Sequence, residues 1–131
     1  MLFDWSDYLS VAKNLKAKTD GQPHTNANEA IQRTAISRAY YSAYHLAVNY
    51  AINNLGYKPE KNGPNQYHAD IQGIYRRQLS NPDHQEIKTI LYRLNKARKD
   101  SDYESESLGN AQALLASIIS EADKVKAILR Y

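Results

Sequence analysis

Apolar side chains recur every three or four residues along most of the chain, which is the spacing of an α-helix rather than of a β-strand. The pattern predicts helices over about residues 5–17, 29–55, 68–79, 83–101 and 108–129. No strand-like alternation and no internal repeat accompanies them. We therefore expect an all-α protein, an antiparallel bundle of about five helices that forms a single domain over residues 1–131.

The predicted helix starts lie at short polar residues, whose side chains can accept a hydrogen bond from a free backbone N–H. The expected caps are Asp4, Asn26 or Asn28, Asp83 and Ser107. The segment from Tyr57 to Asn65 is a long connection that contains Gly and Pro, and its role is not readable from the sequence.

The longest predicted helix carries two different repeats. Ala35, Ala39, Ala43 and Ala47 recur every fourth position, and such small residues allow a neighbouring helix to approach closely. A seven-residue repeat comprises Ile31, Arg38, His45 and Ile52. Because two polar residues interrupt this second line, it belongs either to the core or to an interface.

The amino-acid composition excludes some classes of protein but does not indicate an activity. The chain has no cysteine, so it forms neither a disulfide nor a thiolate metal site, and we expect a cytoplasmic protein. No apolar run is long enough to cross a membrane. The net charge of +3 permits contact with nucleic acid but does not require it, and eleven tyrosines predict hydroxyl groups within the core.

A polar network is expected inside the bundle. Arg98 lies on the apolar face of its helix, and Asp102, four residues later, is its neighbour on the same face. A buried guanidinium needs a carboxylate partner, since an unpaired one costs several kcal/mol. We expect Arg38 and Asp102 to form an ion pair, with Tyr41 or Tyr103 hydrogen-bonded nearby.

Three segments together resemble the HEPN domain family. They are Asp4-Trp5-Ser6-Asp7-Tyr8-Leu9, Ser37-Arg38-Ala39-Tyr40-Tyr41-Ser42-Ala43-Tyr44-His45 and Arg98-Lys99-Asp100-Ser101-Asp102-Tyr103. The resemblance spans nearly the whole chain. It implies a helical bundle that forms a homodimer, acts in prokaryotic toxin–antitoxin, defence or RNA-processing systems, and often has a nucleotidyltransferase-type partner protein.

Active members of the family carry Arg, four to six residues and then His, and they cleave RNA without a metal through the ribose 2′-hydroxyl. Here Tyr103 stands in the place of that His after Arg98, and a tyrosine is a poor base near neutral pH. Arg38 and His45 satisfy the loose spacing in a different helix. The candidate catalytic residues are therefore Arg38, His45, Arg98 and Tyr103, and the binding or structural polar network comprises Tyr40, Tyr41, Ser42 and Asp102.

Three functions remain open at this point. The first is a HEPN-type protein that binds RNA, or a metal-independent endoribonuclease. The second is a catalytically inactive dimeric module that binds a partner protein. The third is a bundle that binds a nucleotide or another small ligand among its tyrosines. No cofactor is expected, and the scattered histidines do not have the spacing of metal ligands.

Overall fold

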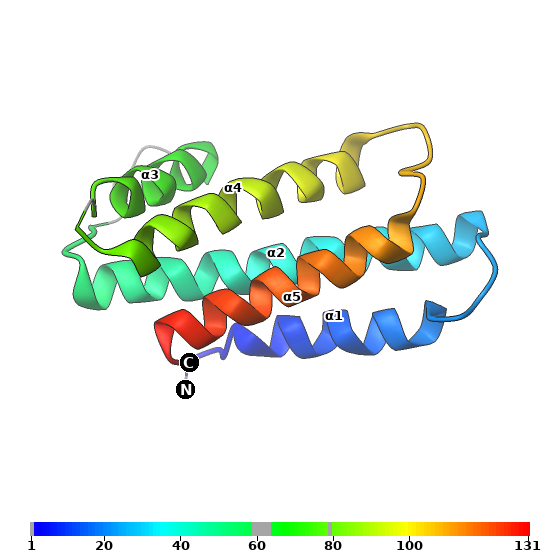
Figure 1. The fold of residues 1–131 in the computed structure, drawn as a ribbon, viewed down its shortest axis with the longest axis horizontal. Coiled ribbons are helices and arrows are strands. Elements are labelled where there is room, and N and C mark those ends of the chain that lie inside the picture. The colour runs from blue at the N-terminus through cyan, green and yellow to red at the C-terminus, as the bar shows by residue number, and fades with distance from the viewer. Residues whose placement is uncertain (1, 59–63, 79) are drawn as a thin grey trace.

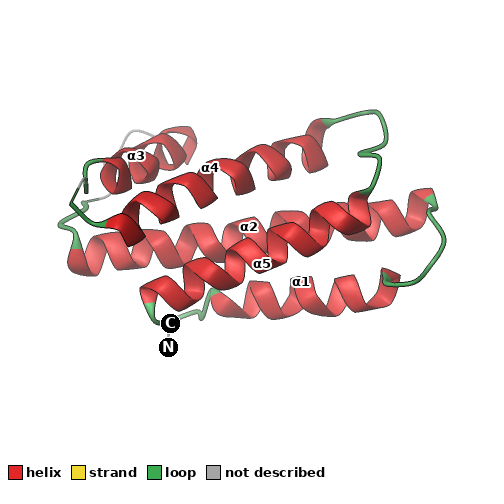
Figure 2. Ribbon diagram, viewed as in Figure 1, coloured by secondary structure: helices red, strands yellow, loops and turns green. Residues whose placement is uncertain are grey.

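The computed structural model describes residues 2–58, 64–78 and 80–131, which fold into helices without a strand in those ranges (Figure 2). The helices are α1 (Ser6–Thr19), α2 (Asn26–Asn54), α3 (Pro64–Arg76), α4 (Pro82–Tyr103) and α5 (Ala111–Leu129). The expected all-α fold class is confirmed.

The longest helix, α2, organises the bundle. Helices α1, α4 and α5 each pack along it, whereas the short helix α3 lies mainly against α4 (Figure 1). The C-terminal end of α5 lies close to the start of α1 (Figure 1). Helix α2 therefore has more neighbouring helices than any other helix.

The alanine repeat predicted in the long helix is confirmed as a packing surface. Ala35, Ala39, Ala43 and Ala47 have no exposed surface. Removing this apolar surface from water stabilises the fold, and the short side chains let neighbouring helix backbones come close. The large rings of Tyr40 and Tyr75 are also fully buried, and the Tyr75 hydroxyl donates to the Ala47 carbonyl at 2.8 Å.

The caps predicted for three helices, α2, α4 and α5, are wrong. The capping side chains are those of Thr25, which accepts from the Asn28 N–H at 3.0 Å, Asn81 and Asn110. Each of these three residues directly precedes its helix and has a non-helical backbone conformation. The expected caps Asn26, Asn28 and Asp83 lie inside their helices, and Ser107 lies before the cap of α5.

Helix bounds also differ from the sequence pattern: α2 begins at Asn26 and α5 at Ala111, where the pattern predicted residues 29 and 108. Helix α3 begins at Pro64, which is compatible with a first helical residue because proline lacks an N–H, so the last part of the long connection is helical. The helix ends at Arg76, before the predicted end at Leu79, which itself lies outside the described residues. Helix α4 continues to Tyr103, which makes Asp102 and Tyr103 helical.

A buried ion pair fastens the loops at one end of the bundle. Glu29 accepts hydrogen bonds from the Ser107 hydroxyl at 2.7 Å and from Arg33 Nε at 3.0 Å. The Arg33 guanidinium also donates to the carbonyl oxygens of Ser101, Glu104 and Glu106 at 3.1, 2.7 and 2.7 Å. One charged pair on α2 thereby holds the whole connection between α4 and α5.

Candidate functional site

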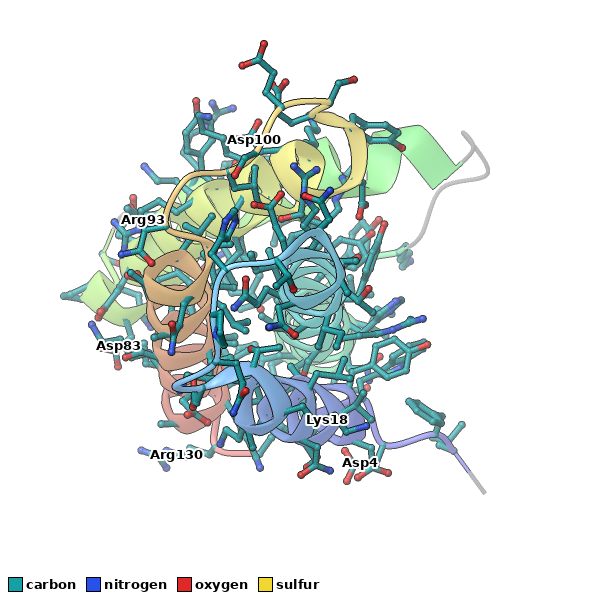
Figure 3. The ribbon with its side chains drawn as sticks, turned by 90° about the vertical axis from the view of Figure 1, so that its right-hand side faces the viewer. Asp4, Lys18, Asp83, Arg93, Asp100 and Arg130 are labelled. Carbon is teal, nitrogen blue, oxygen red and sulfur yellow. The ribbon has the colours of Figure 1, made fainter. Side chains whose placement is uncertain are left out.

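The seven-residue line on α2 lies at the protein surface, so its interpretation as core is wrong. Arg38 and Ile52 are exposed, with 41% of Ile52 accessible, and His45 is half-buried. Seen along the helices, α2 lies between α1 and α4, with α5 on one side (Figure 3). The two polar residues of the line are therefore at least partly accessible to solvent.

Helix α1 brings aromatic rings onto this open side of α2. The Trp5 ring stacks on the His45 ring, with centroids 3.6 Å apart and an angle of 13° between the planes. Tyr8 contacts Trp5 edge-on at 5.2 Å, and the Arg38 guanidinium lies 4.9 Å from the Tyr8 centroid. This last contact is a cation–π interaction, which orients Arg38 without neutralising its charge.

Helix α4 contributes a second, buried arginine. Only 8% of Arg98 is exposed, and its guanidinium lies 5.4 and 5.7 Å from the rings of Tyr40 and Tyr41. Arg98 Nη2 donates to Asn95 Oδ1 at 2.7 Å, and Nη1 lies 3.8 Å from Asp102 Oδ2. The predicted proximity of Arg98 and Asp102 is confirmed, and α4 itself supplies both polar partners.

A continuous series of contacts connects the two arginines. Tyr41, which lies beside Arg98, is 6.2 Å from His45, which in turn stacks on Trp5. We call this group the arginine–aromatic cluster; its members are Trp5, Tyr8, Arg38, Tyr41, His45 and Arg98. Segments from three helices thus place two guanidinium groups and four rings next to one another.

The expected ion pair between Arg38 and Asp102 does not form among the described residues. Arg38 turns toward Tyr8 on α1, whereas the nearest basic partner of Asp102 is Arg98. Whether two such side chains meet depends on how α2 is rotated between its neighbours, and the sequence does not specify that rotation. Arg98 lies one helical turn before Asp102 on the same helix, so the two can pair however α2 is rotated.

Tyr103 lies apart from the guanidinium of Arg98. It is the last residue of α4 and is 76% exposed. Five residues correspond to about 140° of rotation on an α-helix, so the two side chains point in different directions. The sequence motif of Arg98 and Tyr103 therefore does not assemble into one site within this chain.

Two members of the expected polar network are interior residues. Tyr40 is buried, and this burial raises the pKa of its hydroxyl above the usual 10.0 although the nearby Arg98 charge opposes the shift. Ser42 has no exposed surface, and its hydroxyl has no hydrogen-bond partner within the described part of the chain. Neither side chain reaches the surface of the cluster.

Sequence reasoning missed Trp5, Tyr8 and Asn95 as members of the site. Trp5 and Tyr8 fit the apolar repeat of the first helix, and that repeat does not distinguish a packing residue from a site residue. Their position in the first of the three segments that resemble the HEPN family is the feature of the sequence that could have indicated a role in the site. Asn95 could have been found from its position three residues before the buried Arg98, since side chains with this spacing share a helix face.

Comparisons with family models, with curated proteins and with solved structures gave no match to this chain. Over the described ranges, no helix has the length and apolarity needed to cross a membrane. The same part of the chain holds no group of three or more His, Cys, Asp or Glu residues that could bind a metal ion.

Proposed function

We propose that the chain is an RNA-binding protein of the HEPN type, which binds single-stranded RNA along the arginine–aromatic cluster. The observation that carries this proposal is the series of contacts from Arg38 through Tyr8, Trp5, His45 and Tyr41 to Arg98. The resemblance of the three sequence segments to that family points to the same ligand.

The chemistry of the cluster suits a single strand. Unpaired bases stack on aromatic rings, and each such contact contributes about 1–3 kcal/mol with little dependence on sequence. Arg38 is exposed and has no carboxylate partner among the described residues, so its guanidinium is free to contact a phosphate. Arg98 is buried beside the rings and adds positive potential beneath them.

Binding is a better-supported function than cleavage. Cleavage at the 2′-hydroxyl requires a group that accepts its proton and another that protonates the leaving oxygen. His45 is the one cluster member suited to proton transfer, and its ring is stacked on Trp5. Tyr103 projects away from Arg98, so the family's second group is not in place within one chain.

The only tryptophan of the chain provides a direct assay, because Trp5 belongs to the cluster. A fluorescein-labelled single-stranded RNA should bind with a rise in anisotropy and with a parallel change in Trp5 emission. For Arg38→Gln we expect weaker binding and a salt dependence, as log Kd against log salt, that is smaller by about 0.7, the value for one lost phosphate contact on a single strand.

Arg93→Gln is the matched control for this variant. Arg93 is also an exposed arginine, but it pairs with Glu121 on the side of α4 that faces α5 (Figure 3). The control should bind RNA with the affinity of the original protein. Equal losses for the two variants, or RNA binding that leaves Trp5 emission unchanged, would contradict the proposal. Incubation of RNA with the protein in EDTA tests cleavage separately.

A dimeric module that binds a partner protein is the second candidate function, and one apolar surface favours it. Leu2 is 96% exposed and Phe3 54% exposed, and both line a groove of about 490 Å³ together with Ile52 and Tyr131. Exposed apolar side chains that cluster in this way are typical of interfaces. Light scattering should give twice 14.9 kDa, and Ile52→Asp should reduce this mass to that of one chain.

A further inference from the structure

A groove between α3 and α4 lies outside the arginine–aromatic cluster. It has a volume of about 540 Å³, within the usual range for small-molecule sites. Two faces line it, one from each helix. They consist of Gln72, Gly73 and Arg76 on α3 and of Lys88, Thr89 and Tyr92 on α4.

The charged groups that line the groove are both cationic. Arg76 and Lys88 contribute one charge each, and no carboxylate belongs to the lining. Over the described residues, neither cation has an ion-pair partner within 4.0 Å, although most other basic side chains on α4 pair with an acidic one. Two unneutralised cations on facing walls favour an anionic ligand between them.

The end of α3 would ordinarily work against an anion, because the last carbonyl groups of a helix carry partial negative charge. Gln85 offsets part of this effect by donating to these carbonyl groups. Its Nε2 lies 3.0, 3.1 and 3.2 Å from the carbonyl oxygens of Tyr75, Arg76 and Gln78. These contacts engage the negative helix end and also fix α3 against α4, so the groove is held open by the fold.

The remaining lining residues suit a ring attached to the anion. The Tyr92 side chain is 64% exposed and offers a face on which a ring can stack. Gly73 has no side chain in the α3 wall of the groove. A Cβ at this position would lie 3.2 Å from the Arg77 guanidinium, which is a tight contact. Gln72 and Thr89 supply an amide and a hydroxyl for hydrogen bonds.

We propose that the groove between α3 and α4 binds a phosphate monoester attached to a ring, with Arg76 and Lys88 on the phosphate and Tyr92 against the ring. This chemistry occurs both in a free mononucleotide and at the 5′-phosphorylated end of an RNA strand. The groove shares no residue with the arginine–aromatic cluster, so this inference and the proposed RNA binding stand or fall separately.

Isothermal titration calorimetry of the full chain with AMP tests the proposal, with adenosine and inorganic phosphate as the two halves of the probe. AMP should bind more tightly than either half. Lys88→Gln should weaken AMP binding about tenfold, as expected for one lost charge-assisted contact. Tyr92→Ala should weaken it at least fivefold through the lost stacking. Lys99→Gln, an exposed lysine on the same helix outside the groove, should leave it unchanged.

A pair of RNA strands distinguishes the two sources of the phosphate. If a 5′-phosphorylated strand binds more tightly than its 5′-hydroxyl counterpart and Lys88→Gln abolishes the difference, while AMP does not bind, the groove holds an RNA end. The proposal is overturned if AMP binds no better than adenosine and the two strands bind equally. It is also overturned if Lys99→Gln weakens AMP binding as much as Lys88→Gln.

Discussion

The substitution Glu29→Gln tests whether one buried carboxylate holds the end of the bundle together. The side chain of Glu29 is 11% exposed and receives hydrogen bonds from Ser107 and Arg33. The Ser107 hydroxyl, followed by His24 and Arg33, holds the pKa of Glu29 at about 2, although burial acts in the opposite direction. Glutamine keeps the shape of the side chain and removes the charge that these donors stabilise.

The size of the effect follows from that pKa. The carboxyl titrates near 4.5 without these interactions, and each tenfold change in acidity corresponds to about 1.4 kcal/mol. The full difference corresponds to roughly 3 kcal/mol, which residual contact with water reduces to about 2 kcal/mol. Because the pKa is lower in the folded state, this stability is complete above pH 4.5 and is lost as the pH falls toward 2.

Urea unfolding followed by circular dichroism measures both the magnitude and its pH dependence. At pH 7 the Glu29→Gln variant should have a free energy of unfolding about 2 kcal/mol lower than the original protein. The difference should shrink between pH 4.5 and pH 2 as Glu29 becomes protonated. Glu121→Gln is the control, because Glu121 binds the half-exposed Arg93 and should cost under about 1 kcal/mol.

Two results would refute this reasoning. If the difference between Glu29→Gln and the original protein were the same at pH 7 and pH 2.5, the charge of Glu29 would not be its source. If Glu121→Gln cost as much as Glu29→Gln, burial and the additional hydrogen bond from Ser107 would contribute nothing beyond an ordinary surface ion pair.

Three further predictions concern the interior and one helix cap. Tyr75→Phe removes the buried hydrogen bond to the Ala47 carbonyl and should lower the free energy of unfolding by about 1 kcal/mol in urea. Burial raises the pKa of Tyr40 and Tyr75 above 10.0, so ultraviolet absorbance should show at least these two tyrosines protonated near pH ~11 until the protein unfolds. Asn81→Ala removes the side-chain cap on the His84 N–H and should cost about 1 kcal/mol by the same unfolding measurement.

Periodic features of the sequence predicted the fold well. The alanine repeat of α2 is fully buried, because spacing along one helix decides which small residues share a row. Arg98 was also placed correctly, since it follows Leu94 and Ala97 on a face that is otherwise apolar. In both cases the information is local to one helix, so no knowledge of its neighbours is needed.

Features that depend on backbone angles or on two helices were not predictable in this way. Thr25, Asn26 and Asn28 can all act as caps, and the extended backbone of Thr25 selects it. The partner of Arg38 depends on the rotation of α2, which places Arg38 over Tyr8 on α1. The spacing of residue types along the chain gives neither the backbone angles of a cap nor the rotation of one helix against another.

The two repeats of α2 explain why the sequence pattern alone did not decide whether the seven-residue line lies in the core or at an interface. Residues four apart advance by about 40° around a helix, so the alanine row turns through roughly 120° between Ala35 and Ala47 and stays buried throughout. Residues seven apart return to within about 20°, so the line through Arg38 and His45 stays on one side. The line through Arg38 and His45 is only partly covered, by the rings of Tyr8 and Trp5, and this is where the arginine–aromatic cluster forms. Substitutions along the line should therefore alter binding more than stability, whereas substitutions in the alanine row should do the reverse.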